Sequence, residues 1–238
     1  QLVALVQRVK AAVDEVERNA GGISFFELTT AIAMLHFDAS RCDAIVIEVG
    51  LGGRLDSTNV LAPSVSAVTS IGLDHQHVLG HDLPTIAAEK AGIIKPGVPV
   101  VSGVADRAAA AVVAERAAEM GSPLFWIGRD FKWRGEPLPR WGSTIHYEGI
   151  TPPLGPPCSM QISMEGRHQV RNAAIALAIV DLLRAGRDDA PDQSSFRETA
   201  RPETARPALP SLDLPQSAIA SALGQLQCEA RIEGVQLR

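Results

Sequence analysis

Residues 45–59 read IVIEVGLGGRLDSTN, and this stretch decides the fold. The apolar run that ends at Glu48 predicts a strand at 44–49 inside a parallel sheet, because such strands are covered on both faces and need not alternate. A glycine-rich turn at 50–53 follows, and glycine lets the backbone turn sharply and approach a ligand closely. Ligands of open α/β sheets gather at the carboxyl ends of strands. Glu48 is therefore a candidate site residue.

Strand-like and helical segments alternate around this stretch. Ser24 and Glu27 form the Ser-x-x-Glu pattern of a capping box and predict a helix that runs to about His36. This alternation predicts an α/β fold with a mostly parallel sheet flanked by helices. The further strands are expected at 65–72, 98–104 and 123–127, and the further helices at 2–16, 83–94, 107–120 and 170–183.

Residues 128–165 have a different character. They hold Trp133 and Trp141, several prolines, and alternating runs at 143–147 and 159–164. Alternation of polar and apolar residues is typical of strands with one solvated face. We expect a small antiparallel β excursion here.

The segment 187–212 is rich in Asp, Arg, Pro, Ser and Thr and repeats ETARP in tandem at 198–207. A repeat without an apolar stripe cannot pack a core, so a flexible insertion is predicted. A helix at 215–226 and a strand at 231–237 are expected after it. The predicted organisation is thus a domain at 1–186, a linker at 187–212 and a return to the same domain at 213–238.

The composition agrees with an enzyme-like chain. Its 238 residues are 46% hydrophobic, which is enough for a sizeable core. The formal net charge of −5 argues against nucleic acid or anionic membranes as partners, and no apolar stretch reaches the length of a membrane helix. The cysteines 42, 158 and 228 are scattered and odd in number. They are interpreted as small apolar residues in a reduced, cytoplasmic protein.

Three residues at or beyond predicted strand ends could carry chemistry: Glu48, His75 and Lys90. A carboxylate and an imidazole at neighbouring strand ends could share a divalent cation, although Mg²⁺ prefers oxygen ligands. Each residue also has an ordinary structural interpretation: Glu48 as a helix cap, His75 as a polar strand end and Lys90 as a surface lysine. A dinucleotide-binding turn is excluded, because Leu55 occupies the place of the third glycine.

Five segments carry a family resemblance: SFFELTTAIAMLHF (24–37), IVIEVGLGGRLDSTN (45–59), TSIGLDHQHVLG (69–80), IAAEKAGIIKPGVPVV (86–101) and HQVRNAAIALA (168–178). Together they resemble the folylpolyglutamate synthase/dihydrofolate synthase family of the ATP-dependent Mur ligase superfamily. The resemblance covers about 1–186 and returns at 225–238. It implies a central ATPase domain of the Mur ligase type.

The activity implied by the resemblance is that of a cytoplasmic amide ligase of folate biosynthesis. ATP would phosphorylate a substrate carboxylate, and the amine of L-glutamate would attack the acyl phosphate. The implied small molecules are ATP, Mg²⁺, L-glutamate and dihydropteroate or folate, and the full-length protein is expected to be a monomer. Glu48 and His75 would hold Mg²⁺, and Lys90, carbamylated, would complete the catalytic set. A carbamate replaces the lysine's positive charge by a negative one, which can approach the metal.

Other site residues are implied motif by motif. Those implied for the pterin-bearing substrate are Ser24, Phe25, Phe26, Glu27, Leu55, Asp56 and Ser57. The two phenylalanines could form an apolar wall for a heteroaromatic ring, or equally a core pair at a helix start. Asn172 resembles the residue at the adenine end of ATP, and Arg231 the arginine that reaches its phosphates. Around Arg231 the chain reads Cys-Glu-Ala-Arg where the family usually has Trp-Pro-x-Arg, which weakens that assignment.

The family's phosphate-binding loop, G-x-x-G-K-[ST], does not occur in these 238 residues, nor does its C-terminal Rossmann-like domain. We therefore expect a central fragment that lacks parts at both ends and has no ligase activity by itself. Two alternatives stay open: another Mur-type ligase that acts on a peptidoglycan precursor, and a degenerate protein that binds pterins or nucleotides without catalysis.

Overall fold

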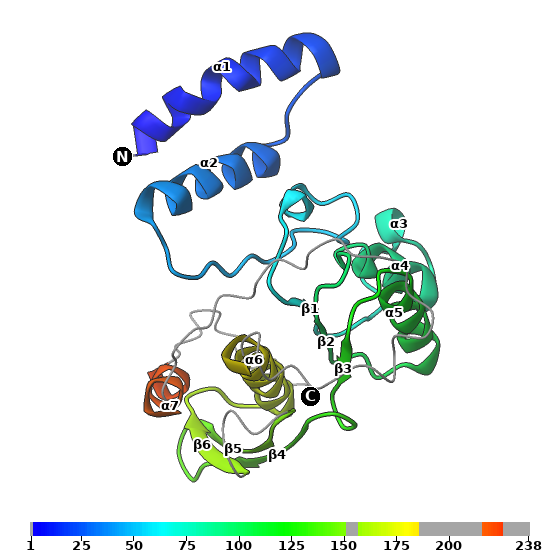
Figure 1. Cartoon of the computed structure of the whole chain (residues 1–238), viewed down its shortest axis with the longest axis vertical. Coiled ribbons are helices and arrows are strands. Elements are labelled where there is room, and N and C mark those ends of the chain that lie inside the picture. The colour runs from blue at the N-terminus through cyan, green and yellow to red at the C-terminus, as the bar shows by residue number, and fades with distance from the viewer. Residues whose placement is uncertain (1, 151–156, 186–215, 226–238) are drawn as a thin grey trace, which may run out of the picture. The chain divides into compact units, whose positions relative to one another are not determined.

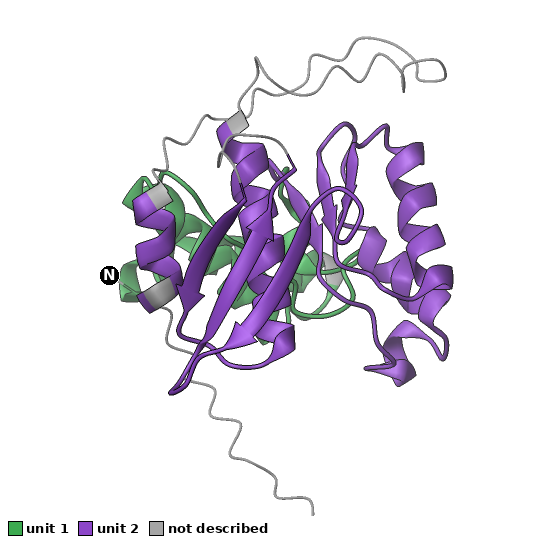
Figure 2. Ribbon diagram, turned by 90° about the horizontal axis from the view of Figure 1, so that it is seen from below, with its two compact units in different colours: residues 1–62 green, residues 63–238 purple. Residues whose placement is uncertain are grey.

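The computed structural model describes residues 2–150, 157–185 and 216–225 (Figure 1). The chain divides into two compact units, unit 1 at residues 1–62 and unit 2 at residues 63–238 (Figure 2). Each unit is described by itself. The predicted linker at 187–212 and the strand at 231–237 lie outside the described residues.

Unit 1 is built from two helices and a short 3-10 helix. Helix α1 spans Leu2–Ala20, α2 spans Phe25–Ser40 and η1 spans Ser57–Val60. The capping box is present as predicted: Ser24 Oγ accepts from the Glu27 N–H at 3.2 Å, and the Glu27 carboxylate accepts from the Ser24 N–H at 2.8 Å. The chain leaves α2 through Arg41 in the left-handed conformation, which is common at helix ends.

The predicted strand at 44–49 is wrong for this structure. These residues have no regular secondary structure, and Val46 is 95% exposed. A strand exists only when a neighbour accepts and donates its backbone hydrogen bonds. The described residues of unit 1 contain no strand, so the apolar run has no pairing partner there.

Unit 2 contains the predicted parallel sheet. Strands β1 (Ser66–Val68), β2 (Val100–Ser102) and β3 (Leu124–Trp126) lie in the order β1-β2-β3, with Ser66 opposite Val100 and Val100 opposite Leu124. Each strand is shorter than the apolar run that predicts it. The connections contain α3 (Gln76–Leu79), α4 (Leu83–Ala91) and α5 (Arg107–Glu119).

Both faces of this sheet are covered, as a parallel sheet requires. Val68 and Val100 pack with buried residues of α4 and α5, such as Ala87 and Val113. Their neighbour Val101 points to the other face and belongs to the cluster formed with α6 (Arg167–Ala185). The period of two along the strand therefore assigns one residue set to each helix layer.

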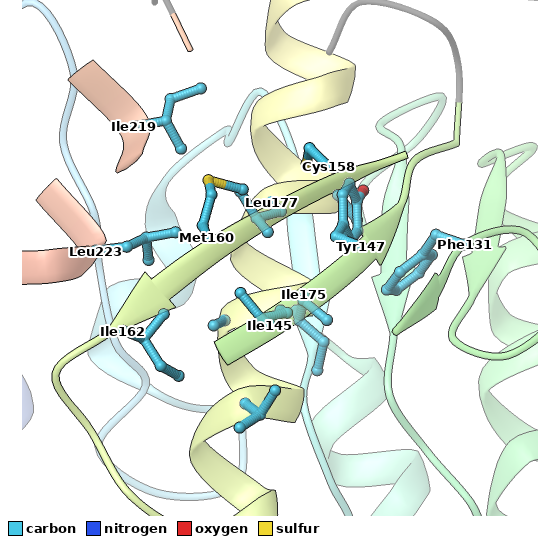
Figure 3. Packing of buried hydrophobic residues seen from close by; sticks show 14 of the residues in the cluster. Phe131, Ile145, Tyr147, Cys158, Met160, Ile162, Ile175, Leu177, Ile219 and Leu223 are labelled. Atoms are coloured by element: carbon cyan, nitrogen blue, oxygen red, sulfur yellow. The ribbon is translucent and has the colours of Figure 1, made fainter. Parts of the chain in front are cut away.

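The expected antiparallel excursion is also present, and it has three strands. β4 (Lys132–Pro137), β5 (Ser143–Glu148) and β6 (Cys158–Ile162) lie in the order β4-β5-β6. Figure 3 shows side chains of β5, β6, α6 and α7 (Gln216–Gln225) meeting in one cluster. Helix α6 thus contributes to the cores of both sheets. The predicted α/β class with a small antiparallel sheet is confirmed.

None of the helices in the described part of the chain combines the length and apolarity needed to span a bilayer. Cys158 is buried in the cluster that β5 and β6 form with α6, as a small apolar residue would be, whereas Cys42 is exposed. Cys228 lies outside the described residues.

Candidate functional site

The carboxyl end of β1 leads directly to the predicted histidine. After β1 ends at Val68, the chain runs to His75, which precedes the short helix α3. His75 has φ +49°, a left-handed conformation that non-glycine residues rarely adopt. Its side chain makes no helix-capping hydrogen bond, so the strained backbone serves no cap. Strain of this kind is concentrated at functional sites, which supports a role for His75.

Asp74 accompanies this histidine. Its Oδ1 accepts from the backbone N–H of His75 at 2.8 Å, and its Oδ2 lies 3.7 Å from Nε2 of the ring. Both side chains are largely exposed. The loop therefore presents a carboxylate and an imidazole side by side at the carboxyl edge of the sheet, which is a suitable donor pair for a cation.

Lys90 lies in the last turn of α4 and is half-buried. Ala87 and Ala91, small residues on the same helix, are buried against the sheet and let the helix lie close to it. The turn that follows α4 is held by two hydroxyls: Ser66 Oγ donates to the Ile93 carbonyl at 3.4 Å, and Ser122 Oγ donates to the Lys95 carbonyl at 2.9 Å. The end of α4 is thereby fixed to the sheet that also carries His75.

Glu48 is the third residue predicted for the catalytic set. Glu48 is exposed and belongs to unit 1, whereas His75 and Lys90 belong to unit 2. Among the described residues there is no group of three or more His, Cys, Asp or Glu side chains placed to hold a metal ion. The convergence of Glu48, His75 and Lys90 on one cation stays a prediction.

Within unit 1, the start of α2 and the glycine turn meet. A Cβ built on Gly50 would lie 2.5 Å from Cζ of Phe26, so the ring rests on the bare backbone of the turn. Ser57 Oγ donates to Thr30 Oγ1 at 3.2 Å and forms a second link to α2. Phe25 and Leu55 remain about 80% exposed. An apolar, accessible surface therefore borders the turn, and its use as a wall for the substrate stays a prediction.

Asp56 organises the turn. Its carboxylate accepts from the backbone N–H groups of Leu51 and Thr58, both at 2.9 Å, and from the Thr58 hydroxyl at 2.5 Å. Partial burial opposes its ionisation, but these hydrogen bonds outweigh burial and lower the pKa of Asp56. Hydrogen bonds with Ser24 likewise lower the pKa of Glu27. The polar groups of Ser24, Glu27 and Asp56 are thus already engaged in shaping the backbone, a role that sequence reasoning missed for Asp56.

Of the two residues predicted for ATP, Asn172 lies exposed in the first half of α6, and Arg231 lies outside the described residues. Beside Asn172, Arg171 is half-buried and faces the end of β2, where a Cβ built on Gly103 would lie 3.2 Å from its Nη2. Sequence reasoning did not single out Arg171. Its spacing of four from the buried Ile175 places both on one helix face and could have indicated the sheet-facing position.

Comparison with known proteins finds relatives that are folylpolyglutamate or dihydrofolate synthases. The chain is 41% identical over 178 residues to folylpolyglutamate synthase of Lacticaseibacillus casei, covering 74% of this chain and 41% of the relative. It is 42% identical over 196 residues to dihydrofolate synthase/folylpolyglutamate synthase of Bacillus subtilis (strain 168), covering 76% and 42%. The chain therefore spans about two fifths of the length of these curated relatives. No protein-family model matches it.

Solved structures of folylpolyglutamate synthase are also similar to this chain. A complex of folylpolyglutamate synthase with AMPPCP matches 98% of this chain and 52% of its own, with a TM-score of 0.76 and 33% identity. A complex that also contains folate matches 98% and 51%, with a TM-score of 0.75 and 32% identity. The parallel sheet, its helices and the antiparallel sheet are thus those of a Mur-ligase-type fold.

Proposed function

This chain belongs to the folylpolyglutamate synthase/dihydrofolate synthase family, and from that premise we propose that the protein containing it is an ATP-dependent ligase that joins L-glutamate to dihydropteroate or a folate. The γ-phosphoryl group of ATP passes to the substrate carboxylate and ADP leaves. The amine of glutamate then attacks the acyl phosphate, an amide bond forms, and inorganic phosphate leaves.

We assign the catalytic set to Glu48, His75 and Lys90. The donor chemistry fits a magnesium ion that keeps several waters: a carboxylate from Glu48, an imidazole from His75 and, if Lys90 is carbamylated, a further anionic oxygen. Mg²⁺ at this position would neutralise charge on the transferring phosphoryl group. His75 supports the assignment by its left-handed backbone, and Lys90 by its fixed position at the end of α4.

We assign the pterin-bearing substrate to the surface beside the glycine turn. Phe25, Phe26 and Leu55 offer apolar contact area there, while Ser24, Glu27, Asp56 and Ser57 hold the backbone that presents it. A flat heteroaromatic ring gains most from stacking on such a surface. These polar residues then act mainly as positioning residues, because their hydrogen-bonding groups are occupied within the protein.

We assign the nucleotide to the carboxyl edge of the parallel sheet in unit 2, with Asn172 at the adenine end and Arg231 toward the phosphates. AMPPCP is bound in two of the similar structures, which supports ATP as the cosubstrate. The position also agrees with the general location of ligands at the carboxyl ends of parallel strands.

The observation that carries the proposal is the 41% identity to the Lacticaseibacillus casei enzyme over 178 residues, which is 74% of this chain. The full-length protein should form ADP and phosphate only when L-glutamate and either dihydropteroate or tetrahydrofolate are both present. Turnover with a peptidoglycan precursor and an amino acid, but not with pterins, would identify another Mur-type ligase. Pterin or nucleotide binding without any ADP release would identify a non-catalytic binding protein.

A further inference from the structure

Three segments converge at the carboxyl edge of the parallel sheet. The backbone N–H of Gly103, just after β2, donates to the Val68 carbonyl of β1 at 2.9 Å. A Cβ built on Gly103 would collide with the Thr69 carbonyl oxygen and would lie 2.6 Å from Cδ1 of Ile175 on α6. The ends of β1 and β2 and the third turn of α6 are therefore in close contact, and only glycine leaves them that room.

Arg171 brings a positive charge to this junction. Its Nη2 lies 3.2 Å from the position that a Gly103 Cβ would take, and the residue is half-buried. No ion pair joins its guanidinium to an acid among the described residues. Arg171 therefore brings to this edge of the sheet a positive charge that no ion pair with a described acid neutralises.

We propose that Arg171 binds a phosphate oxygen of the nucleotide, an inference that rests on the proposed function. The guanidinium lies where the ends of neighbouring parallel strands receive ligands, and its planar donors match a phosphate group. Its neighbour Asn172 on α6 is the residue assigned to the adenine end, so one helix turn contacts two parts of the same molecule. Gly103 serves this function by leaving the guanidinium space beside the strand ends.

A purely structural role predicts different behaviour. In that case Arg171 would donate to carbonyls at the strand ends and stabilise the packing of α6 on the sheet. Its loss would lower the unfolding temperature and weaken the binding of all ligands alike. A phosphate contact instead affects only ligands that carry phosphate.

The test uses the full-length protein and compares the binding of AMPPCP with that of adenosine, which lacks phosphates, by calorimetry. Arg171→Gln should weaken AMPPCP binding about tenfold or more, the size expected for a charge-assisted hydrogen bond, and leave adenosine binding within about twofold. Arg171→Lys keeps the charge but not the planar donors. Its affinity for AMPPCP should lie between those of the wild type and of Arg171→Gln. Arg167→Ala is the control. Arg167 belongs to the same helix, but its Cζ lies 5.9 Å from the ring centroid of Trp133, so its loss should not weaken AMPPCP binding selectively.

Steady-state kinetics give the second readout. The KM for ATP should rise in Arg171→Gln while the KM for glutamate and for the pterin substrate stays within about twofold of the wild-type value. Unchanged AMPPCP binding, equal losses for AMPPCP and adenosine, or a rise in the KM for glutamate alone would overturn the inference. Wild-type turnover in the same assay reports on the proposed function separately, so failure of one is distinguishable from failure of the other.

Discussion

At the scale of single residues, Asp181 is a carboxylate that the fold buries completely. Its Oδ2 accepts from the Tyr147 hydroxyl at 2.7 Å and from the Ile150 N–H at 3.2 Å. Its Oδ1 has no hydrogen-bond partner among the described residues. Burial disfavours the charged form and raises the pKa of Asp181 to about 6, although the two hydrogen bonds oppose this effect.

This raised pKa predicts a loss of stability with rising pH. The folded state holds the proton more tightly than the unfolded state, so the contribution of Asp181 is complete below about pH 4 and disappears as the pH rises through 6. The loss should be on the order of 3 kcal/mol, because one pKa unit corresponds to about 1.4 kcal/mol. Asp181→Asn should remove this pH dependence in urea unfolding followed by tryptophan fluorescence. Equal pH slopes for the wild type and the variant would contradict the assignment.

The contact between Gly50 and Phe26 predicts a functional rather than a structural defect. In Gly50→Ala the new methyl group would lie 2.5 Å from the end of the Phe26 ring, so the ring must move away. Phe26 is 43% exposed, and its displacement should change the free energy of unfolding by no more than about 1 kcal/mol. The KM for the pterin-bearing substrate should rise several-fold. Gly72→Ala is the control, because nothing lies within 4 Å of a Cβ at that position.

Residue-scale features could be predicted where their partners are near in sequence. The two members of the capping box, Ser24 and Glu27, are only three positions apart, and the pattern alone revealed it. Asp181 contacts Tyr147, which is 34 residues away, and the sequence contains no local signal for that pair. The position of Arg171 beside Gly103 could not be predicted for the same reason.

At the scale of elements, the N-terminus of α2 allows a direct test of the capping box. Ser24→Ala removes the acceptor for the Glu27 N–H and should destabilise the protein by about 1 kcal/mol. Ser24→Thr keeps a hydroxyl acceptor and should recover most of that loss. Ser40→Ala is the control, because this hydroxyl lies at the other end of the helix and makes only a 3.4 Å contact with His36. Circular dichroism during urea unfolding measures the effect, and equal stabilities for Ser24→Ala and Ser40→Ala would contradict it.

Helices were predicted more accurately than strands, and the reason is physical. The backbone hydrogen bonds of a helix are local, so caps such as Asp82 and Asp106 determine where α4 and α5 begin. A strand depends on a neighbour that is distant in sequence. The run at 44–49 has the composition of a buried strand, but the described residues of unit 1 contain no strand that could pair with it.

At the scale of the whole molecule, the sequence predicted the main layers of unit 2. The parallel sheet, the helices on both of its faces and the antiparallel excursion follow from the order of the apolar runs. The sequence could not reveal that α6 supports both sheets, because this depends on which faces of one helix pack against each. The division into units 1–62 and 63–238 was likewise not predicted.

Glu48 and His75 belong to different units of the chain. If both hold one cation, a change at Glu48 must alter the metal at His75. Mn²⁺ in the presence of AMPPCP should broaden the ring resonances of His75 in the full-length protein. Glu48→Gln should reduce that broadening at the same Mn²⁺ concentration, because the bound ion loses an anionic ligand.

Glu115→Gln serves as the matched control, since Glu115 is exposed on α5 and has no assigned role. It should leave both the broadening and the ligase activity unchanged. Suppose that Glu48→Gln abolishes activity but leaves the His75 resonances as broad as before. Glu48 would then act elsewhere, and the shared metal centre would be wrong, whereas the proposed ligase activity would stand. The expected result for Glu48→Gln is loss of activity together with reduced broadening of the His75 resonances, because the substitution removes an anionic ligand of the proposed metal ion.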